Sequence, residues 1–170
     1  MRRRDLFIAP LCEAVLILVA GVAAWTLHKP LIFSSLGPTA FELIETPERR
    51  SARPYNVIVG HLIGVLCGFA ALKLTHAWSV PAVSTSSISI LRVWAAVLAA
   101  LLTVLGTLLA RAQQPAALST TLLIATGSMQ RLEDGVNIML AILLVTAAGE
   151  PLRRWRMRSK ERLNGRPAAE

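Results

Sequence analysis

Four ionisable side chains lie inside or at the edge of apolar stretches of this sequence, namely Glu13, Glu42, Glu45 and His61. A charge within a hydrocarbon core is costly, so such residues usually face a polar interior or pair with one another. Because glutamate and histidine can also exchange protons, we expect Glu13, Glu42 and His61 to couple a transport step to protons. Glu13 and His61 lie at similar depth in separate spans and are expected to meet. The alternative for His61 is a neutral imidazole bonded to a backbone carbonyl.

Residues 34–45, Ser-Ser-Leu-Gly-Pro-Thr-Ala-Phe-Glu-Leu-Ile-Glu, form a second candidate for chemistry. Gly37 permits a sharp turn and Pro38 suits the first position of a helix, which predicts a helix over 38–46. Such a helix spans roughly 13 Å, about half of a ~30 Å hydrocarbon core. The unpaired N–H groups and positive dipole end at its start favour an anion. A short buried helix without a ligand is the simpler alternative.

A second short apolar stretch, 116–127, is rich in hydroxyl groups and follows Gln113-Gln114-Pro115. We expect its N-terminus to approach that of the first short helix near the middle of the membrane, forming a pocket. The pocket offers backbone N–H, hydroxyl and amide groups but no lysine, which suits a small, weakly hydrated anion. The residues expected to bind substrate are Ser35, Gly37, Pro38, Thr39, Gln113, Gln114, Pro115, Ser119 and Thr120.

The composition is that of a helical membrane protein, with 54% hydrophobic residues among 170 and only 16% charged ones. The net charge of +8 nevertheless comes largely from both ends of the chain, and the basic tail directly follows an apolar span. We therefore expect Arg153–Arg166 to meet anionic lipid headgroups rather than nucleic acid. Cys12 and Cys67 lie in apolar runs and are expected to be small core residues. Since no metal-ligand motif occurs, we expect neither a metal nor a cofactor.

Long and short apolar stretches alternate in the order long, short, long, and this order occurs twice. It predicts an all-α membrane protein of two inverted repeats, with four full-length transmembrane helices and two short, broken helices. Asn56 and Asn137 lie 81 residues apart near the starts of corresponding spans. The expected division is a basic N-terminal segment (1–5), a first membrane repeat (6–75), an extramembrane connector (76–91), a second membrane repeat (92–151) and a basic cytoplasmic tail (152–170).

Two topologies fit this order. If each short stretch and its lead-in cross the bilayer, each half crosses three times and the second half is inverted. Arg49, Arg50, Arg53 and Arg111 then lie on the side of the basic termini, whereas they lie opposite if the short stretches only re-enter. The positive-inside rule favours six crossings, with both termini cytoplasmic and the chain in the inner (plasma) membrane. Re-entrant segments remain the alternative.

Two segments strongly resemble the HPP family of small integral membrane proteins: residues 36–41, Leu-Gly-Pro-Thr-Ala-Phe, and 53–64, Arg-Pro-Tyr-Asn-Val-Ile-Val-Gly-His-Leu-Ile-Gly. The resemblance extends from Leu6 to about Gly149. The His-Pro-Pro motif of the family falls at Gln113-Gln114-Pro115, where only the second proline is present. The resemblance implies a membrane protein usually described with four spans, and for some members nitrite transport.

We therefore interpret the sequence as an integral membrane transporter of a small inorganic anion, with nitrite as the first candidate. One alternative is a non-transporting membrane subunit. Another is a membrane-embedded enzyme using Glu13 and His61, which is weaker because no activated nucleophile or metal-ligand set accompanies them. No catalytic activity is expected. A six-crossing bundle of this size has thin walls, so we also expect a homo-oligomer.

The six-crossing topology predicts that the loop containing Arg49–Arg53 faces the cytoplasm. Cysteine introduced at Ser51, with Cys12 and Cys67 replaced, should resist an impermeant thiol reagent in intact cells and react after the cells are opened. Ready labelling of well-inserted protein in intact cells would instead favour re-entrant segments.

Overall fold

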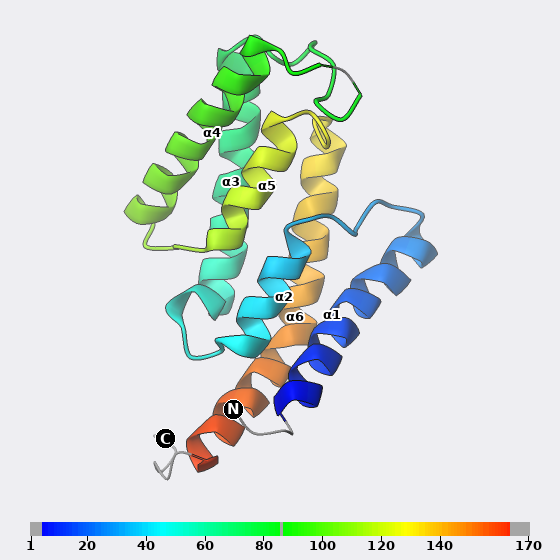
Figure 1. Ribbon diagram of the computed structural model, residues 1–170, viewed down its shortest axis with the longest axis vertical. Coiled ribbons are helices and arrows are strands. Elements are labelled where there is room, and N and C mark those ends of the chain that lie inside the picture. Colours follow the sequence, from blue (N-terminus) through cyan, green and yellow to red (C-terminus); the bar gives the residue numbers. More distant parts are fainter. Residues whose placement is uncertain (1–4, 86, 164–170) are drawn as a thin grey trace.

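The computed structural model describes residues 5–85 and 87–163, and all regular structure in that part of the chain is helical (Figure 1). Six α-helices and one short 3-10 helix follow one another. Their bounds are α1 Asp5–Leu27, α2 Leu36–Glu45, η1 Arg50–Ala52, α3 Pro54–Leu74, α4 Ile90–Leu109, α5 Pro115–Ala125 and α6 Leu132–Leu163. Among the described residues, four helices are long and apolar enough to cross a membrane: α1, α3, α4 and α6. The all-α fold with four full-length helices and two short ones is therefore confirmed.

The helix contacts follow the order of the two halves. Helices α1 and α2 pack together and against α6, while α4 and α5 pack together and against α3. If α1 is exchanged with α4, α2 with α5 and α3 with α6, the three contacts of the first group become the three contacts of the second. The contacts of α3 with α6 and of α2 with α5 are unchanged by the exchange. This pattern is consistent with an inverted repeat. The last long helix of each half packs mainly in the other half.

The four long helices divide into two central and two peripheral ones. In α3 and α6, 44% of the residues in the most apolar window are buried, against 17% in α1 and 28% in α4. The apolar side chains that α1 and α4 expose include Phe7, Leu18, Trp25, Leu101 and Leu109. Because no aqueous protein tolerates this much exposed apolar surface, the outer faces of α1 and α4 are suited to contact lipid.

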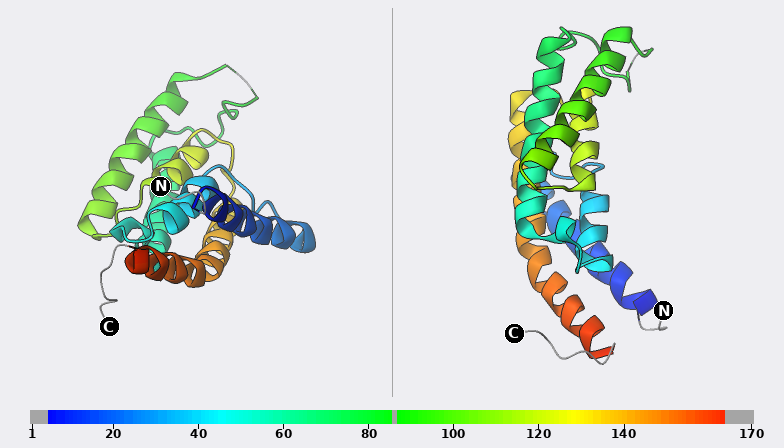
Figure 2. Two further views of the ribbon diagram at one scale, coloured as in Figure 1. Left: turned by 60° about the horizontal axis from the view of Figure 1, so that its bottom comes forward. Right: turned by 90° about the vertical axis from the view of Figure 1, so that its left-hand side faces the viewer.

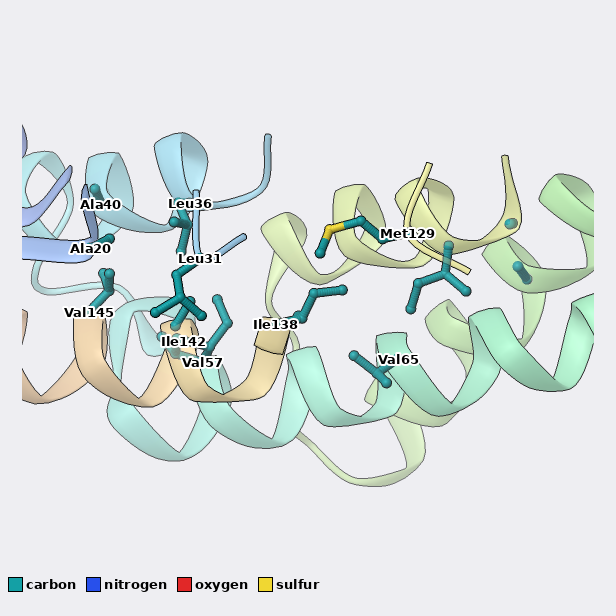
Figure 3. Close-up of a cluster of buried hydrophobic side chains, with 14 of the residues drawn as sticks. Ala20, Leu31, Leu36, Ala40, Val57, Val65, Met129, Ile138, Ile142 and Val145 are labelled. Atoms are coloured by element: carbon teal, nitrogen blue, oxygen red, sulfur yellow. The ribbon is translucent and has the colours of Figure 1, made fainter. Parts of the chain in front are cut away.

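Helix α6 runs along most of the length of the molecule (Figure 2), and it contributes Ile138, Ala141, Ile142 and Val145 to the buried apolar core. In the middle of this core, Leu31 of the α1–α2 loop and Leu36 at the start of α2 lie close to Val57 of α3 and Ile142 of α6 (Figure 3). All four side chains are at most 1% exposed. This cluster holds the beginning of α2 between the two central helices, and so fixes where the short helix starts.

Two helix boundaries differ from those expected. Helix α2 begins at Leu36, so Pro38 is its third residue, which costs nothing because the first turn has no intrahelical N–H bonds to lose. Helix α6 does not end at Glu150-Pro151 but continues to Leu163. The extra turns carry side chains that bind the end of α2, which stabilises the helix beyond its proline. Arg166 and the arginines at 2–4 lie outside the described residues.

Basic residues of α6 bind the carbonyl oxygens at the end of α2. Arg156 donates to the Ile44 oxygen and Lys160 to the Glu45 oxygen. Arg153 donates to the Pro47 oxygen at 2.8 Å. The last carbonyls of a helix have no partner in the helix itself and carry its negative dipole end, so cations are favourable there. Part of the basic tail thus serves the protein interior rather than lipid headgroups.

Arg92 of α4 has the corresponding position at the end of α5. Its side chain is 1% exposed, and it donates to the carbonyl oxygens of Ala125, Pro81 and Val80 and to the Gln130 side chain. It therefore ties the 76–89 connector to the end of α5. This role of Arg92 depends on groups 11 to 38 residues away along the chain, which only the folded structure brings to it.

A row of glycines lets α3 approach α5 closely. A Cβ atom at Gly64 would lie 2.7 Å from the Ala117 carbonyl oxygen, and one at Gly68 would lie 2.9 Å from Cβ of Ile124. The Gly64 carbonyl oxygen also accepts a hydrogen bond from Thr121. Small residues at such a contact permit the close backbone packing on which helix association in membranes depends.

Gly64→Val should lower the melting temperature of the detergent-purified protein sharply, because the side chain has no room against the α5 backbone. Overpacking of this kind costs about 1–3 kcal/mol or more. Gly37→Ala is the matched control, since a Cβ at Gly37 meets no atom within 4 Å. Equal melting temperatures for the two variants would contradict the close α3–α5 contact.

Candidate functional site

Six buried polar residues line the junction of α2, α3 and α5, and we call them the polar seam. The seam consists of Ser35, Thr39, Glu42, His61, Gln114 and Thr120, all at most 9% exposed. Ser35, Thr39 and Glu42 are spaced by four and three residues, so they lie on one face of α2. All six were named from the sequence, and the structure brings them together at one junction.

The two short helices overlap at their N-terminal ends, so that the start of each lies beside a later turn of the other. Ser35 Oγ, directly before α2, lies 2.7 Å from Thr120 Oγ1 in the second turn of α5. Gln114, directly before α5, lies beside the carboxyl group of Glu42 in the second half of α2. The helices run in opposite directions from this overlap (Figure 1). The two N-termini therefore pass each other, and the polar side chains between them occupy the overlap.

Glu42 Oε2 and Gln114 Nε2 are buried and form no hydrogen bond of regular geometry among the described residues, although the Gln114 amide lies close enough to the Glu42 carboxyl group to act as its donor. Their other oxygens are engaged, since Glu42 Oε1 accepts from Ser51 at 3.2 Å and Gln114 Oε1 accepts from the Ala116 N–H at 3.3 Å. An unpaired donor in a buried place is costly unless something binds to it. The seam thus brings an amide donor and a carboxyl group together, and a small anion that binds the amide would take the place of the Glu42 carboxyl oxygen.

His61 and Thr39 form a contact that depends on protonation. His61 Nδ1 lies 2.8 Å from the Val57 carbonyl oxygen, which can only accept, so this nitrogen carries a hydrogen. Nε2 lies 3.3 Å from Thr39 Oγ1, which also lies 2.8 Å from the Ser35 carbonyl oxygen. With a neutral ring, the single Thr39 hydrogen serves either Nε2 or Ser35. With a cationic ring, Nε2 donates to Thr39 and Thr39 donates to Ser35.

Other residues expected at the site lie outside the seam. Gly37, Pro38, Gln113 and Pro115 are exposed, and Ser119 is half-buried. Gln113 contributes through its backbone, because its carbonyl oxygen accepts a hydrogen bond from Asn56 at 3.2 Å. This bond ties the start of α3 to the lead-in of α5. The face of each short helix that turns inward is set by packing, so these neighbours of seam residues point away from it.

Glu13 is half-buried on α1, and its charged neighbour is Glu45 rather than His61. The two hydrogen-bond partners of His61 are Thr39 and Val57. The two side chains therefore have different neighbours, although the sequence predicted that they would meet. The structure therefore joins His61 to the seam and leaves Glu13 near the end of α2.

Sequence reasoning missed two contributors to the site. Ser51 of η1 donates to Glu42, and Gly60 lets Gln114 approach α3, since a Cβ there would lie 2.8 Å from Gln114 Cβ. Gly60 lies about one helical turn before Gly64 on α3, and only the structure shows what packs on it. Among the described residues, no three His, Cys, Asp or Glu side chains gather as a metal would require.

Four membrane-length helices around two half-length ones, with a buried polar seam between them, define a multi-pass integral membrane protein. Residues 1–149 match the family model described as HPP, transmembrane region. The chain belongs to this HPP family, as its glycine, proline and histidine motifs indicated. The match ends before the basic part of α6. No curated protein and no solved structure matches the chain.

Proposed function

We propose that the chain transports a small inorganic anion, with nitrite as the first candidate, together with a proton. The observation that carries this proposal is the buried Glu42–Gln114 pair of the polar seam, in which neither Glu42 Oε2 nor Gln114 Nε2 has a hydrogen bond of regular geometry among the described residues. Inverted half-helices with polar groups at their overlap are a common way to build a transporter's substrate site. We propose no catalytic role for the seam.

The donors of the seam favour a singly charged and weakly hydrated anion. Gln114 offers an amide group, and one hydroxyl of the bonded Ser35–Thr120 pair keeps its hydrogen, but the seam holds no lysine or arginine. Neutral donors compensate only part of the dehydration cost of an ion, and that cost rises steeply with its charge. Phosphate and sulfate are therefore poor substrates under this proposal, and nitrite is a suitable one.

Glu42 is the residue that carries the coupled proton in this proposal. An anion bound at Gln114 lies beside the Glu42 carboxyl group, and two like charges about 4 Å apart repel by about 4 kcal/mol at an effective dielectric constant near 20. The anion therefore binds with Glu42 protonated and leaves as the proton leaves. His61 lies in the same seam, and its contact with Thr39 changes with its charge, so it is a second coupling group. Glu13 has no place in this relay.

A polar cavity of about 440 Å³ lies between the α1–α2 loop and the start of α6. Lys29 and Arg131 line it together with the acidic Glu133 and Asp134, so the formal charges of its lining balance. Arg131 is bound to Glu133 at 2.9 Å. The charge of this cavity therefore does not favour an anion, and the proposal rests on the polar seam.

We propose an inner-membrane location with both termini in the cytoplasm. The start of α1 and the end of α6 lie at the same end of the molecule, together with the loop that contains Arg49 and Arg50 (Figure 1). This arrangement agrees with the positive-inside rule. Ser51 is half-buried against Glu42, so the exposed positions 49 and 50 are better sites for cysteine labelling.

Proteoliposomes with an inwardly directed proton gradient should take up nitrite through the wild-type protein. Glu42→Gln should slow this uptake by about tenfold or more, a barrier change of about 1.4 kcal/mol, because glutamine cannot carry the proton. Exchange between equal nitrite concentrations should persist. Glu48→Gln, at an exposed position, is the matched control and should behave as wild type. If well-inserted protein moves no small anion, the non-transporting alternative is favoured.

His61→Gln tests the second coupling group. Glutamine keeps a donor and an acceptor near Thr39 but cannot titrate, so gradient-driven uptake should be lost while nitrite exchange remains. His76→Gln, which changes an exposed histidine, should leave both activities unchanged. The measurement is the ratio of gradient-driven uptake to exchange for each variant. A wild-type ratio for His61→Gln would assign this histidine a purely structural role.

A further inference from the structure

A cavity of about 590 Å³ lies between the start of α3 and the C-terminal half of α6. It is separate from the polar seam, and none of the seam residues lines it. Ile58 of α3 and Leu143 of α6 form its apolar end, and the small side chain of Ala147 leaves the space between them open. Leu143 is 46% exposed, so the cavity opens toward the surroundings of the helix bundle.

The cavity becomes polar along α6 toward its C-terminus. Thr146 is 3% exposed and lines the cavity, and its hydroxyl group has no hydrogen-bond partner among the described residues. Two turns further on, Arg154 lines the same cavity, and Glu150 lines it between the two. The lining therefore passes from apolar side chains through Thr146 to a charged end, and a phospholipid has apolar chains, ester groups and a charged headgroup in the same order.

Arg154 retains the capacity to bind an anion. Its Nε donates to Glu150 Oε1 at 2.7 Å, while its side chain remains 67% exposed. Glu150 is already bonded by Arg153 through two nitrogens, at 2.7 and 2.9 Å. The three side chains together carry one positive charge, and Arg153 is committed to Glu150 and the Pro47 oxygen. The excess charge is therefore available at Arg154.

The spacing along α6 also fits. Side chains of a helix point toward its N-terminus, so the Arg154 guanidinium lies near Glu150, one turn of about 5.4 Å from Thr146. In a glycerophospholipid, the ester groups and the phosphate are separated by a similar length. Exposed Arg53, directly before the cavity residue Pro54, adds positive charge at the same end.

We propose that this cavity binds one anionic glycerophospholipid of the surrounding bilayer. An acyl chain lies against Ile58 and Leu143, and an ester carbonyl accepts the hydrogen of the Thr146 hydroxyl. The phosphate lies at Arg154. The lipid then fills the space between α3 and α6, the two central helices, and satisfies the one polar atom of the cavity that the protein leaves unpartnered.

Native mass spectrometry of the detergent-purified protein, titrated with dioleoyl phosphatidylglycerol, tests the proposal. Wild type should retain one phosphatidylglycerol about tenfold more tightly than dioleoyl phosphatidylcholine. Ala147→Phe should remove this first bound lipid, because the ring occupies the cavity, and Arg154→Gln should weaken it about tenfold. Thr146→Val should weaken it about threefold. Arg158→Gln is the matched control, since it removes the same charge from an exposed position on α6 outside the cavity.

Several outcomes would overturn the proposal. These are equal affinity for the two lipids, equal effects of Arg154→Gln and Arg158→Gln, or unchanged lipid binding by Ala147→Phe. Displacement of the lipid by inorganic phosphate would make the site a phosphate site instead. A dimer that Ala147→Phe converts to a monomer would show that a second copy of the chain covers the cavity. Circular dichroism of each variant establishes that the helices are intact, so loss of lipid is attributable to the site.

Discussion

The structure depends on one constraint, which is that a helix ending within a membrane must find partners for its terminal backbone groups inside the protein. Helices α2 and α5 are too short to cross and so have ends at this depth. At their C-terminal ends, Arg156 and Lys160 bind the carbonyl oxygens of α2, and Arg92 binds that of α5. At the other ends, Ser35 and Gln114 lie against side chains of the opposite short helix. The same requirement that fixes the fold therefore concentrates polar groups between the two N-terminal turns.

The fold was largely predictable from the sequence because lengths of apolar stretches determine which helices can cross a membrane. The alternation of long and short stretches gave the six helices in order, and their interruption by Gly37-Pro38 and Gln114-Pro115 marked the short ones. The boundary at Pro151 was not predictable in this way. Whether a proline ends a helix depends on what the following turns bind, and the carbonyl groups bound by Arg156 and Lys160 lie more than a hundred residues earlier.

The site was predictable in its residue types and less so in its geometry. Hydroxyl, amide, carboxyl and imidazole groups in apolar stretches are conspicuous, and all six seam residues were recognised on that basis. The orientation of each helix about its own axis was not available from the sequence, so exposed Gly37 and Pro115 were grouped with buried Thr39 and Gln114. Glu13 and His61 were matched by depth alone, although packing directs them toward different neighbours.

The exchange of α3 and α6 between the halves has a consequence for synthesis. When α1, α2 and α3 have emerged from the ribosome, the glycine face of α3 still lacks α5, and the end of α2 still lacks Arg156 and Lys160. Neither half contains all of its own packing partners, so the contacts of the first three helices are complete only when α6 has been synthesised as far as Lys160. Each half therefore becomes stable only through its contacts with the other half.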